Sequence, residues 1–591
     1  MPTVNRNARV TGPTPSSWIH KPSDKIYASC TMHRCLLVPE ILYQIFDFLL
    51  PRQTNASTLI ALAITCKAFQ HPALDILWKD LDDPLLPLVQ CLPRDLWERD
   101  DQLIVSEILS PTYGSSRPFS DLRDQHLRRP FVEADLLTMR SYASRVRTFC
   151  SNTCSEVLHI DTYRAISLAA ETPLMPNLRS LAWCAKFDQY FPYITLFLGA
   201  PQLTRININF YESSSRLSLL PRLKVLHPSI KEAIIDYADS PTMQAVEAIS
   251  GLVCSWGSLT TLTCGPLTAG AWVHLSALPA LRSLNTTLPA IDVTGIAFRC
   301  SFDALQLLKL SKLHLLMPCV TLINRMAPSH LKSLIINLPT SFTSAELREL
   351  FECLRKNTRH LQELSIQGFM PLSPQSEGHT IKSNTLKPLF SLPKLVSIRL
   401  FPNCSFNLDD MTLSQMAPSW PSLKTLILGS EHGWKRRSKL TLKSLLIILV
   451  HCPDLQELGI VIDATKVDWN PIGKPGGGFS HTTLTELHMG DSRVTSATMV
   501  GAFLSDIVPR VTTITAWQTV EMETREGGKK YQRRWEEVQR LLSTFAMVRE
   551  QERQWSERTR IVDAPGVGSS MSLSETSDNS DDESSDDSPD P

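Results

Sequence analysis

One short apolar pattern recurs through most of this 591-residue chain. Segments of the form Leu-x-x-Leu-x-Leu/Ile, often introduced by Pro or by a polar turn, lie between residues 176 and 516. Thirteen occur at gaps of 22 to 34 residues, and their leading apolar residues are Leu178, Leu203, Ile230, Leu259, Leu281, Leu305, Leu331, Leu361, Leu395, Leu423, Leu455, Leu484 and Val511. One Leu-x-x-Leu pair proves little, because such pairs are common in helices. A series at near-regular spacing predicts a stack of similar units.

Each unit is expected to supply a short strand that turns its alternating leucines into the stack, while the next segment closes the outer face. One such outer helix is predicted at 344–356, where Leu347, Leu350, Phe351 and Leu354 share a face. A compact β-sandwich is the alternative fold. It would require turn signals about every 8–12 residues, which is a shorter period than the one observed.

The pattern resembles leucine-rich repeats, whose period is about 20 to 29 residues. The resemblance implies an α/β horseshoe. The Asn or Cys usual eight residues after the first leucine is largely missing, with Asn403 the one clear match, so an irregular solenoid is expected.

Residues between the leucines are expected on the concave side, where a protein partner would bind. We expect the substrate face to include Arg179, Arg205, Lys231, Arg282, Lys309 and Lys332. Charged residues of the later units are Glu363, Arg399, Lys424, Glu457 and Glu486. The weakly basic first half suits an acidic or phosphorylated ligand, although a solvated polar face is the better explanation of any single residue.

A second pattern occupies residues 35–81, CLLVPEILYQIFDFLLPRQTNASTLIALAITCKAFQHPALDILWKDL. Pro39 suits a first helical turn, where its missing amide would be unpaired anyway. The apolar residues after it recur at spacings of three and four and predict one amphipathic helix. Ser57 is expected to cap a second helix that ends at Pro72, and residues 73–79 to form a third.

The order of these residues resembles the F-box. The matching residues are Leu37, Glu40, Ile41, Leu42, Ile45, Phe46 and Leu49, then Cys66, Lys67 and Phe69, then Leu77 and Trp78. One departure is that Val38 stands where the family has proline and Pro39 follows one residue late, a shift that could reduce adaptor affinity.

The F-box resemblance implies docking to a Skp-family adaptor, and through it to a cullin/RING ubiquitin ligase. It assigns adaptor contacts to Leu37, Pro39, Ile41, Ile45, Phe46, Leu49, Leu62, Phe69 and Trp78. Together with the solenoid it implies the substrate-recognition subunit of a Skp–cullin–F-box E3 ubiquitin ligase, which acts by proximity and has no catalytic site of its own. Two alternatives stay open: an F-box scaffold outside an active ligase, and an enzyme with an unfamiliar site.

The predicted plan is a flexible leader (1–30), F-box (31–82), helical connector (83–145), solenoid (146–525), capping helix (526–562) and disordered acidic tail (563–591). Two insertions, 371–385 and 465–481, are expected to be loops. In the tail, Ser577, Ser580 and Ser585 resemble acidophilic kinase sites, although a solubilising acidic end explains the composition as well.

Composition narrows the function further. The 59 basic residues balance 59 acidic ones, which argues against a general nucleic-acid or membrane-surface role. No secretory leader and no apolar span of about 20 residues occurs, so a cytoplasmic or nuclear location is expected. The fourteen cysteines, such as Cys66, Cys184 and Cys254, are expected to be reduced and packed as small hydrophobes.

Motifs for chemistry are missing from the sequence. The GKPGGG segment lacks the order of a phosphate-binding loop. Paired catalytic carboxylates, a nucleophile elbow, an HExxH motif and a metal-ligand array are also lacking, so no cofactor, metal or catalytic residue is predicted.

Overall fold

The computed structural model describes most of the chain between residues 38 and 562. The described ranges are 38–49, 56–81, 85–99, 125–151, 158–170, 173–185, 187–210, 213–227, 229–236, 241–288, 301–312, 315–339, 342–368, 379–401, 404–467 and 477–562. The leader, the acidic tail with its three serines, Leu37 and Asn403 lie outside these residues.

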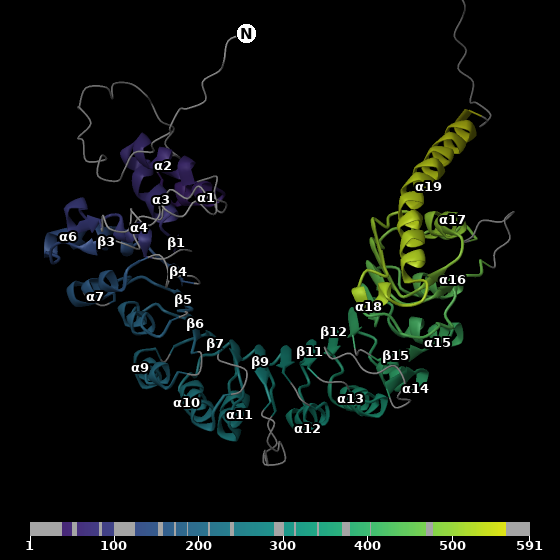
Figure 1. Ribbon diagram of the computed structural model, residues 1–591, viewed down its shortest axis with the longest axis horizontal. Helices are drawn as coiled ribbons and strands as arrows, with labels where there is room; N and C mark the ends of the chain where they lie inside the picture. The colour runs from purple at the N-terminus through teal and green to yellow at the C-terminus, as the bar shows by residue number, and fades with distance from the viewer. Residues whose placement is uncertain are drawn as a thin grey trace, which may run out of the picture.

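A curved parallel sheet lines the inner side of a horseshoe, and helices cover the outer side (Figure 1). The fifteen strands follow chain order: β1 (Asp80–Leu81), β4 (Thr148–Ser151), β5 (Ser180–Trp183), β6 (Arg205–Asn209), β7 (Glu232–Asp236), β8 (Thr261–Cys264), β9 (Ser283–Thr287), β10 (Leu307–Ser311), β11 (Ser333–Leu338), β12 (Glu363–Gly368), β14 (Ser397–Phe401), β16 (Thr425–Leu428), β17 (Glu457–Gly459), β19 (Glu486–Gly490) and β21 (Thr513–Ala516). The fold is the leucine-rich-repeat type of α/β horseshoe that the repeats predicted.

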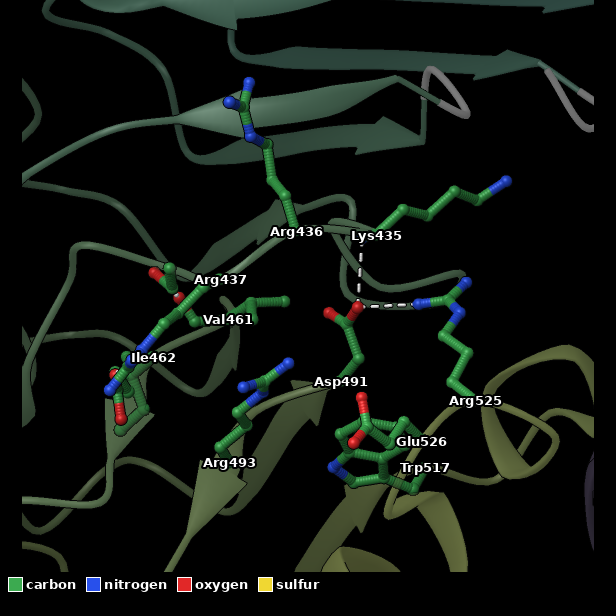
Figure 2. Close-up of a pocket in the computed structure, with 12 residues that line it drawn as sticks. Lys435, Arg436, Arg437, Val461, Ile462, Asp491, Arg493, Trp517, Arg525 and Glu526 are labelled. Carbon is green, nitrogen blue, oxygen red and sulfur yellow. Dashed lines mark hydrogen bonds and ion pairs between the residues drawn. The ribbon is translucent and has the colours of Figure 1, made fainter. Parts of the chain in front are cut away.

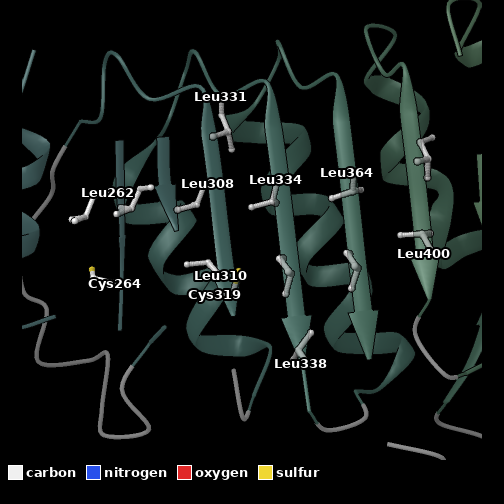
Figure 3. Packing of buried hydrophobic residues seen from close by; sticks show 14 of the residues in the cluster. Leu262, Cys264, Leu308, Leu310, Cys319, Leu331, Leu334, Leu338, Leu364 and Leu400 are labelled. Atoms are coloured by element: carbon white, nitrogen blue, oxygen red, sulfur yellow. The ribbon is translucent and has the colours of Figure 1, made fainter. Parts of the chain in front are cut away.

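The repeat pattern sets the register of this sheet. Each of the thirteen strands from β5 to β21 begins two residues after a leading apolar residue of the predicted series. The second apolar residue of each unit then pairs with its counterpart in the next unit, as Leu308 does with Leu284 and Leu334. These side chains form one continuous buried stack (Figure 3). Each buried leucine contributes roughly 1.5–3 kcal/mol, so the series explains the stability of the array.

The outer layer consists of short helices. They are α7 (Ile160–Ala169), α8 (Ser214–Leu217), α9 (Leu220–Leu226), α10 (Met243–Val253), α11 (Ala269–Ser276), α12 (Met317–Met326), α13 (Ser344–Asn357), α14 (Ser383–Leu386), α15 (Asp410–Met416), α16 (Leu442–His451) and α17 (Ala497–Ile507), with 3-10 turns at Phe191–Leu196, Lys387–Ser391 and Ala417–Ser419. The predicted helix at 344–356 is α13, which begins with a capping box between Thr343 and Glu346.

Three helices form the N-terminal module: α1 (Pro39–Asp47), α2 (Ala56–Thr65) and α3 (Lys67–Leu77). They have a small core of their own, formed by Leu42, Phe46, Leu59, Ala63, Ala73 and Ile76. Two expectations about the helix ends were wrong. Ser57 lies inside α2 rather than capping it, and Pro72 lies within α3, because the break between the two helices falls at Cys66, which has extended backbone.

The module continues into the main sheet. Its last residues form β1, which pairs in parallel with β4. The connector supplies α4 (Leu86–Val89), a 3-10 turn (Arg94–Leu96), the hairpin of β2 (Trp97–Arg99) and β3 (Gln125–Leu127), and α6 (Glu133–Ala143). Its apolar residues, such as Leu88 and Met139, belong to the solenoid core.

The far end of the horseshoe carries α18 (Val520–Glu523) and the long helix α19 (Gly528–Val562), which packs on α17 and β21 through Trp535, Val538 and Leu542. Two small parallel sheets lie beside the main one: β13 (Thr380–Lys382) with β15 (Ser405–Asn407), and β18 (Asp463–Ala464) with β20 (Arg493–Val494). The expectation that 371–385 is entirely loop was therefore wrong, because β13 and the start of α14 lie within it. Within the described residues no helix is long and apolar enough to cross a membrane.

Candidate functional site

An exposed apolar surface covers the outside of the N-terminal module. On α1 and its cap, Ile41, Ile45 and Phe48 are exposed at intervals of three or four residues, and the Phe48 side chain is 89% exposed. On α2, Ile60 and Ile64 are exposed one turn apart. Side chains of this size are normally buried, so this surface, called here the module surface, has the character of an unfilled binding face.

The adaptor contacts predicted from the sequence divide into two groups. Ile41, Ile45 and Pro39, which is the first residue of α1, are exposed and belong to the outer side. The others turn inward: Phe46 is 3% exposed and meets Phe69 edge-on with ring centroids 5.5 Å apart. Leu49 and Leu62 pack against the same core. The inward group therefore supports the fold of the module, and its adaptor contacts stay predictions.

Trp78 lies at the junction between module and solenoid. The pairing of Asp80 with Thr148 places Trp78 in register with Val146, the position that holds the leading apolar residue in later units. Its indole stacks on Tyr142, with centroids 4.7 Å apart and planes 24° apart. Any adaptor contact of Trp78 is confined to the part of the ring that Tyr142 leaves open.

Ion pairs stiffen the same junction. Lys79 Nζ lies 2.9 Å from the Asp47 carboxylate, and Arg145 pairs with Asp75. The Tyr43 hydroxyl donates to Asp75, and burial together with this carboxylate raises the pKa of Tyr43 to about 12. These contacts connect the junction to α1 and α3.

The predicted substrate face is split by the structure. Arg205 and Lys309 lie on strands, as expected, and Arg205 pairs with Glu232 at 3.0 Å. Arg179, Lys231, Arg282 and Lys332 instead lie one residue before their strands begin. The strand bounds therefore place two of the six on strands, and a shared substrate face for all six stays a prediction.

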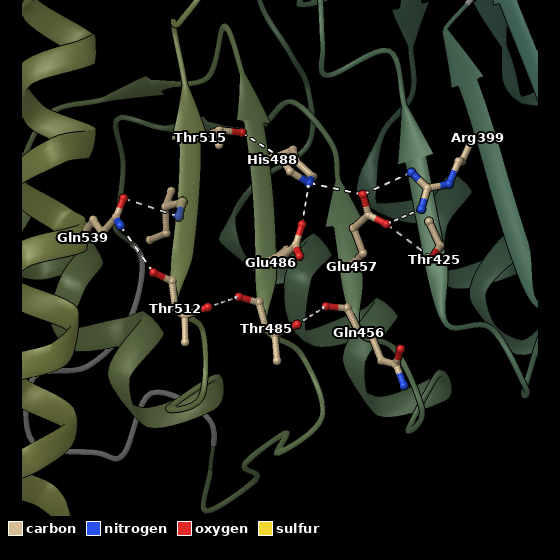
Figure 4. A network of polar contacts seen from close by, with 11 residues as sticks. Arg399, Thr425, Gln456, Glu457, Thr485, Glu486, His488, Thr512, Thr515 and Gln539 are labelled. Atoms are coloured by element: carbon tan, nitrogen blue, oxygen red, sulfur yellow. Dashed lines mark hydrogen bonds and ion pairs between the residues drawn. The ribbon is translucent and has the colours of Figure 1, made fainter. Parts of the chain in front are cut away.

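These residues belong to a continuous backbone ladder along the rim of the sheet. In each unit the residue before the strand donates its N–H to the carbonyl of the equivalent residue in the preceding unit, at 2.7–3.0 Å. We call this row the rim ladder; its members are Lys79, Arg147, Arg179, Thr204, Lys231, Thr260, Arg282, Gln306, Lys332, Gln362, Val396, Lys424, Gln456, Thr485 and Thr512. Figure 4 shows three of them, Gln456, Thr485 and Thr512, at the strand starts, apart from the residues on the strands themselves.

A pocket of about 390 Å³ opens along the middle of the rim ladder. Four consecutive ladder residues line it, together with Pro279, Asp303, Ala304, His330, His360 and Lys394. The imidazoles of His330 and His360 stack with centroids 6.3 Å apart, and Lys394 Nζ lies 2.9 Å from His360 Nδ1. Asp303 is the single acidic residue among those that line the pocket.

The concave face of the later units carries a polar network (Figure 4). Arg399 donates to both carboxylate oxygens of Glu457, at 3.2 and 2.5 Å. His488 Nε2 lies 3.3 Å from Glu457 and 3.6 Å from Glu486, and its Nδ1 lies 2.7 Å from the Thr515 hydroxyl. Glu457, Glu486 and His488 have the mutual spacing of metal ligands, within 4.8 Å. Arg399 already engages both oxygens of Glu457, so the arrangement is a closed ion-pair network.

A second pocket, of about 210 Å³, lies where the strands β16 to β21 end (Figure 2). Asp491 organises it by accepting the backbone N–H groups of Trp434 at 2.7 Å and Lys435 at 2.9 Å, and the guanidinium of Arg525 at 2.6 Å. Burial raises the pKa of Asp491. A Cβ at Gly433 would lie 2.4 Å from Asp491 Cγ, so glycine is required there. This carboxylate fastens three loops together at the C-terminal end of the solenoid.

The described cysteines form no disulfide with one another. Burial raises the pKa of Cys264, Cys404 and Cys452 to about 12 each, as expected for thiols packed as small hydrophobes. Cys66 and Cys184 are half-buried. Cys254 departs from the expectation, because it lies exposed at the end of α10.

Comparisons with known proteins add little to this picture. No protein-family model matches the chain, and no curated protein matches it. Among solved structures, the crystal structure of the Rad7 and Elc1 complex in yeast is similar, with 14% identity and a TM-score of 0.33 over 67% of this chain and 87% of that one. A likeness this distant carries no argument about function, so a function for this chain has to be inferred from its own residues and geometry.

Proposed function

We propose that this protein is the substrate-recognition subunit of a Skp–cullin–F-box ubiquitin ligase. In this proposal the N-terminal module docks a Skp-family adaptor and the solenoid holds the protein to be ubiquitinated. The observation that carries it is the module surface, which lies on a three-helix module with the residue order of an F-box and is attached rigidly to the first strand of a repeat solenoid.

The exposure pattern supports adaptor docking. Phe46 and Leu42 are enough to join α1 to α3, so Ile41, Ile45 and Phe48 are not needed to fold the module. Leaving such side chains in water forfeits roughly 1.5–3 kcal/mol for each that could be buried, and a partner with an apolar groove recovers that energy. Charged residues on this surface would favour its hydration. Between Ile41 and Phe48 the charged residue is Asp47, which is already paired with Lys79.

The rigid junction supports the second half of the proposal. Ubiquitin transfer by such a ligase depends on holding the substrate near the charged conjugating enzyme, and a loose joint would lower the effective concentration of the substrate. Here the backbone carbonyl of Lys79, which follows Trp78, accepts hydrogen bonds from the N–H groups of Arg147 at 2.8 Å and Thr148 at 3.0 Å. The proposal places the protein in the cytoplasm or nucleus with its ligase partners.

Pull-down of a purified Skp adaptor tests the proposal. The test variant is Ile45→Ala with Phe48→Ala, which removes exposed side chains and should leave the module folded. The matched control is Leu168→Ala with Val225→Ala, whose parent side chains are 88% and 78% exposed on α7 and α9. We expect the control to bind like the unmodified protein and the test variant to lose at least about tenfold in affinity, because each removed contact is worth roughly 1 kcal/mol or more.

Two results would count against the proposal. Absence of adaptor binding by the unmodified protein would remove its basis. Equal binding by both variants would show that the module surface is not the contact. If the adaptor binds but ubiquitin transfer to co-purified proteins is independent of Ile45 and Phe48, the protein is an adaptor-bound scaffold rather than a substrate receptor.

A further inference from the structure

The rim ladder has an unusual charge composition. Its fifteen positions hold seven Lys or Arg residues and no Asp or Glu. The whole chain has as many acidic as basic residues, so this bias belongs to the rim and not to the composition. The bias is also positional, because the strand residues next to the ladder include Glu232, Glu363 and Glu457.

The cations of the ladder alternate with neutral residues through its middle. Lys231, Arg282 and Lys332 are separated by Thr260 and Gln306, so one cation occurs in every second unit. Neighbouring strands of a sheet lie about 4.8 Å apart, so these cations repeat at roughly 9.6 Å. A polyproline II segment rises about 3.1 Å per residue with three residues per turn, so it covers about 9.3 Å in three residues and presents every third side chain on the same face.

These three cations are available to a ligand. All three are exposed. Lys231, Arg282 and Lys332 make no ion pair or side-chain hydrogen bond with the part of the chain that the structure describes, whereas Lys79 is paired with Asp47 and Arg179 donates to Gln202 at 3.2 Å. Arg282 and Lys332 line the 390 Å³ pocket, which gives the row a concave centre.

We propose that the rim ladder binds an acidic segment of a partner protein in the polyproline II conformation, with carboxylates at every third residue. Side chains of Lys231, Arg282 and Lys332 then each meet one carboxylate, while Gln306 donates a hydrogen bond between Arg282 and Lys332 and Gln362 donates one beyond Lys332. The identification of that partner as a ubiquitination substrate rests on the proposed function. The binding itself does not.

The spacing distinguishes a polyproline II segment from an α-helix, and also from a β-strand, in which every third side chain alternates between opposite faces. A helix rises about 1.5 Å per residue, so it matches a repeat of about 9.6 Å only with acidic residues six or seven apart. A helix with acids at closer intervals spreads them over several faces. Among peptides with the same net charge, the ladder is therefore expected to prefer those whose acidic residues have the matching interval along the chain.

Fluorescence anisotropy with labelled peptides tests this. The peptides are about 24 residues long, with equal numbers of Asp in a Ser/Thr/Gln background, placed at every third residue, at every second residue, at every seventh residue or in one block. The full-length protein is compared with Lys231→Gln/Arg282→Gln/Lys332→Gln. The control is Arg222→Gln/Arg348→Gln/Lys356→Gln, which removes the same charge from exposed positions on the outer helices α9 and α13.

We expect the every-third peptide to bind the unmodified protein and the control at least about threefold tighter than the other peptides at low salt. The ladder variant should lose about tenfold in affinity and all of this preference, since it lacks three exposed charge contacts. Equal affinity for all peptides, preference for the every-seventh peptide, or equal losses in ladder and control variants would overturn the inference.

The adaptor pull-down is measured on the same preparations. Spacing-dependent peptide binding without adaptor binding would retain the rim site and refute the ligase role. Adaptor binding without spacing-dependent peptide binding would retain the ligase role and refute the rim site. A chain truncated after residue 562 shows whether the acidic C-terminal segment competes; it should bind the every-third peptide at least as tightly as the full chain.

Discussion

Two phenylalanines near the end of α1 give the sharpest test of how the N-terminal module works. Phe46 is 3% exposed and Phe48 is 89% exposed, although only one residue separates them. Phe46→Ala removes a ring that meets Phe69, and truncations of this kind cost about 3–5 kcal/mol. Phe48→Ala removes a ring from water and should change the free energy of unfolding by no more than about 0.5 kcal/mol.

Because the module is small, the free energy lost in Phe46→Ala should be enough to unfold it. A core in so small a unit rarely supplies more than about 3–5 kcal/mol, which is the amount that Phe46→Ala removes. Its core residues form a cluster separate from that of the solenoid, so the loss should stay local. We expect α1, α2 and α3 to unfold while strands β9 to β12 keep their structure.

Hydrogen exchange followed by mass spectrometry measures both regions in one experiment. In Phe46→Ala, amides of α1–α3 should exchange at least about 100-fold faster, the factor that corresponds to about 3 kcal/mol, and amides of β9–β12 should be unchanged. Phe48→Ala should match the unmodified protein in both regions while binding the adaptor more weakly. Retained protection of α1 in Phe46→Ala, or equal loss in the solenoid, would refute a separately cored module.

Two further predictions concern charge and thiol chemistry. Arg129 donates to the Asp135 carboxylate and holds the pKa of Asp135 below its usual 3.8, so the folded state releases this proton more readily than the unfolded state. The resulting stability is present at neutral pH and is lost as the pH falls below 3.8; Asp135→Asn should therefore lower stability at pH 7 and flatten its decline in acid, as measured by exchange of α6 amides. Iodoacetamide at pH 8 should alkylate the exposed Cys254 in the native protein and leave Cys264 and Cys452 unmodified until denaturant is added, because burial raises the pKa of the latter two to about 12.

The sequence was sufficient to locate the strands because one constraint acts at every unit. A leading apolar residue must be buried for neighbouring units to stack, and all thirteen of the predicted ones are buried, including the degenerate Val511. The strand pairing adds two further units, one led by the buried Val146 and one by the half-buried Trp78.

The sites were harder to predict because they depend on directions and on distant partners. The local sequence does not predict that Lys231 and Lys332 lie at the rim of the sheet. Their position depends on the residue at which each strand begins. The stack of Trp78 on Tyr142 joins residues 64 positions apart, which no local pattern encodes. The F-box pattern does not include Phe48, whose exposure depends on how α1 lies against α3.

The rim ladder begins at Lys79, one residue after the aromatic that closes the module. The rim ladder therefore runs without a break from the proposed adaptor-binding module to the proposed substrate-binding residues. Backbone hydrogen bonds between successive units fix the distance between the two. A bound segment centred on Lys231, Arg282 and Lys332 would lie several units from the module, at a distance set by the sheet. Inserting or deleting one whole unit between β5 and β7 would move that segment by about 4.8 Å without touching either binding surface. If ubiquitin transfer depends on proximity, such a change should shift which substrate lysines are modified and leave both affinities unchanged.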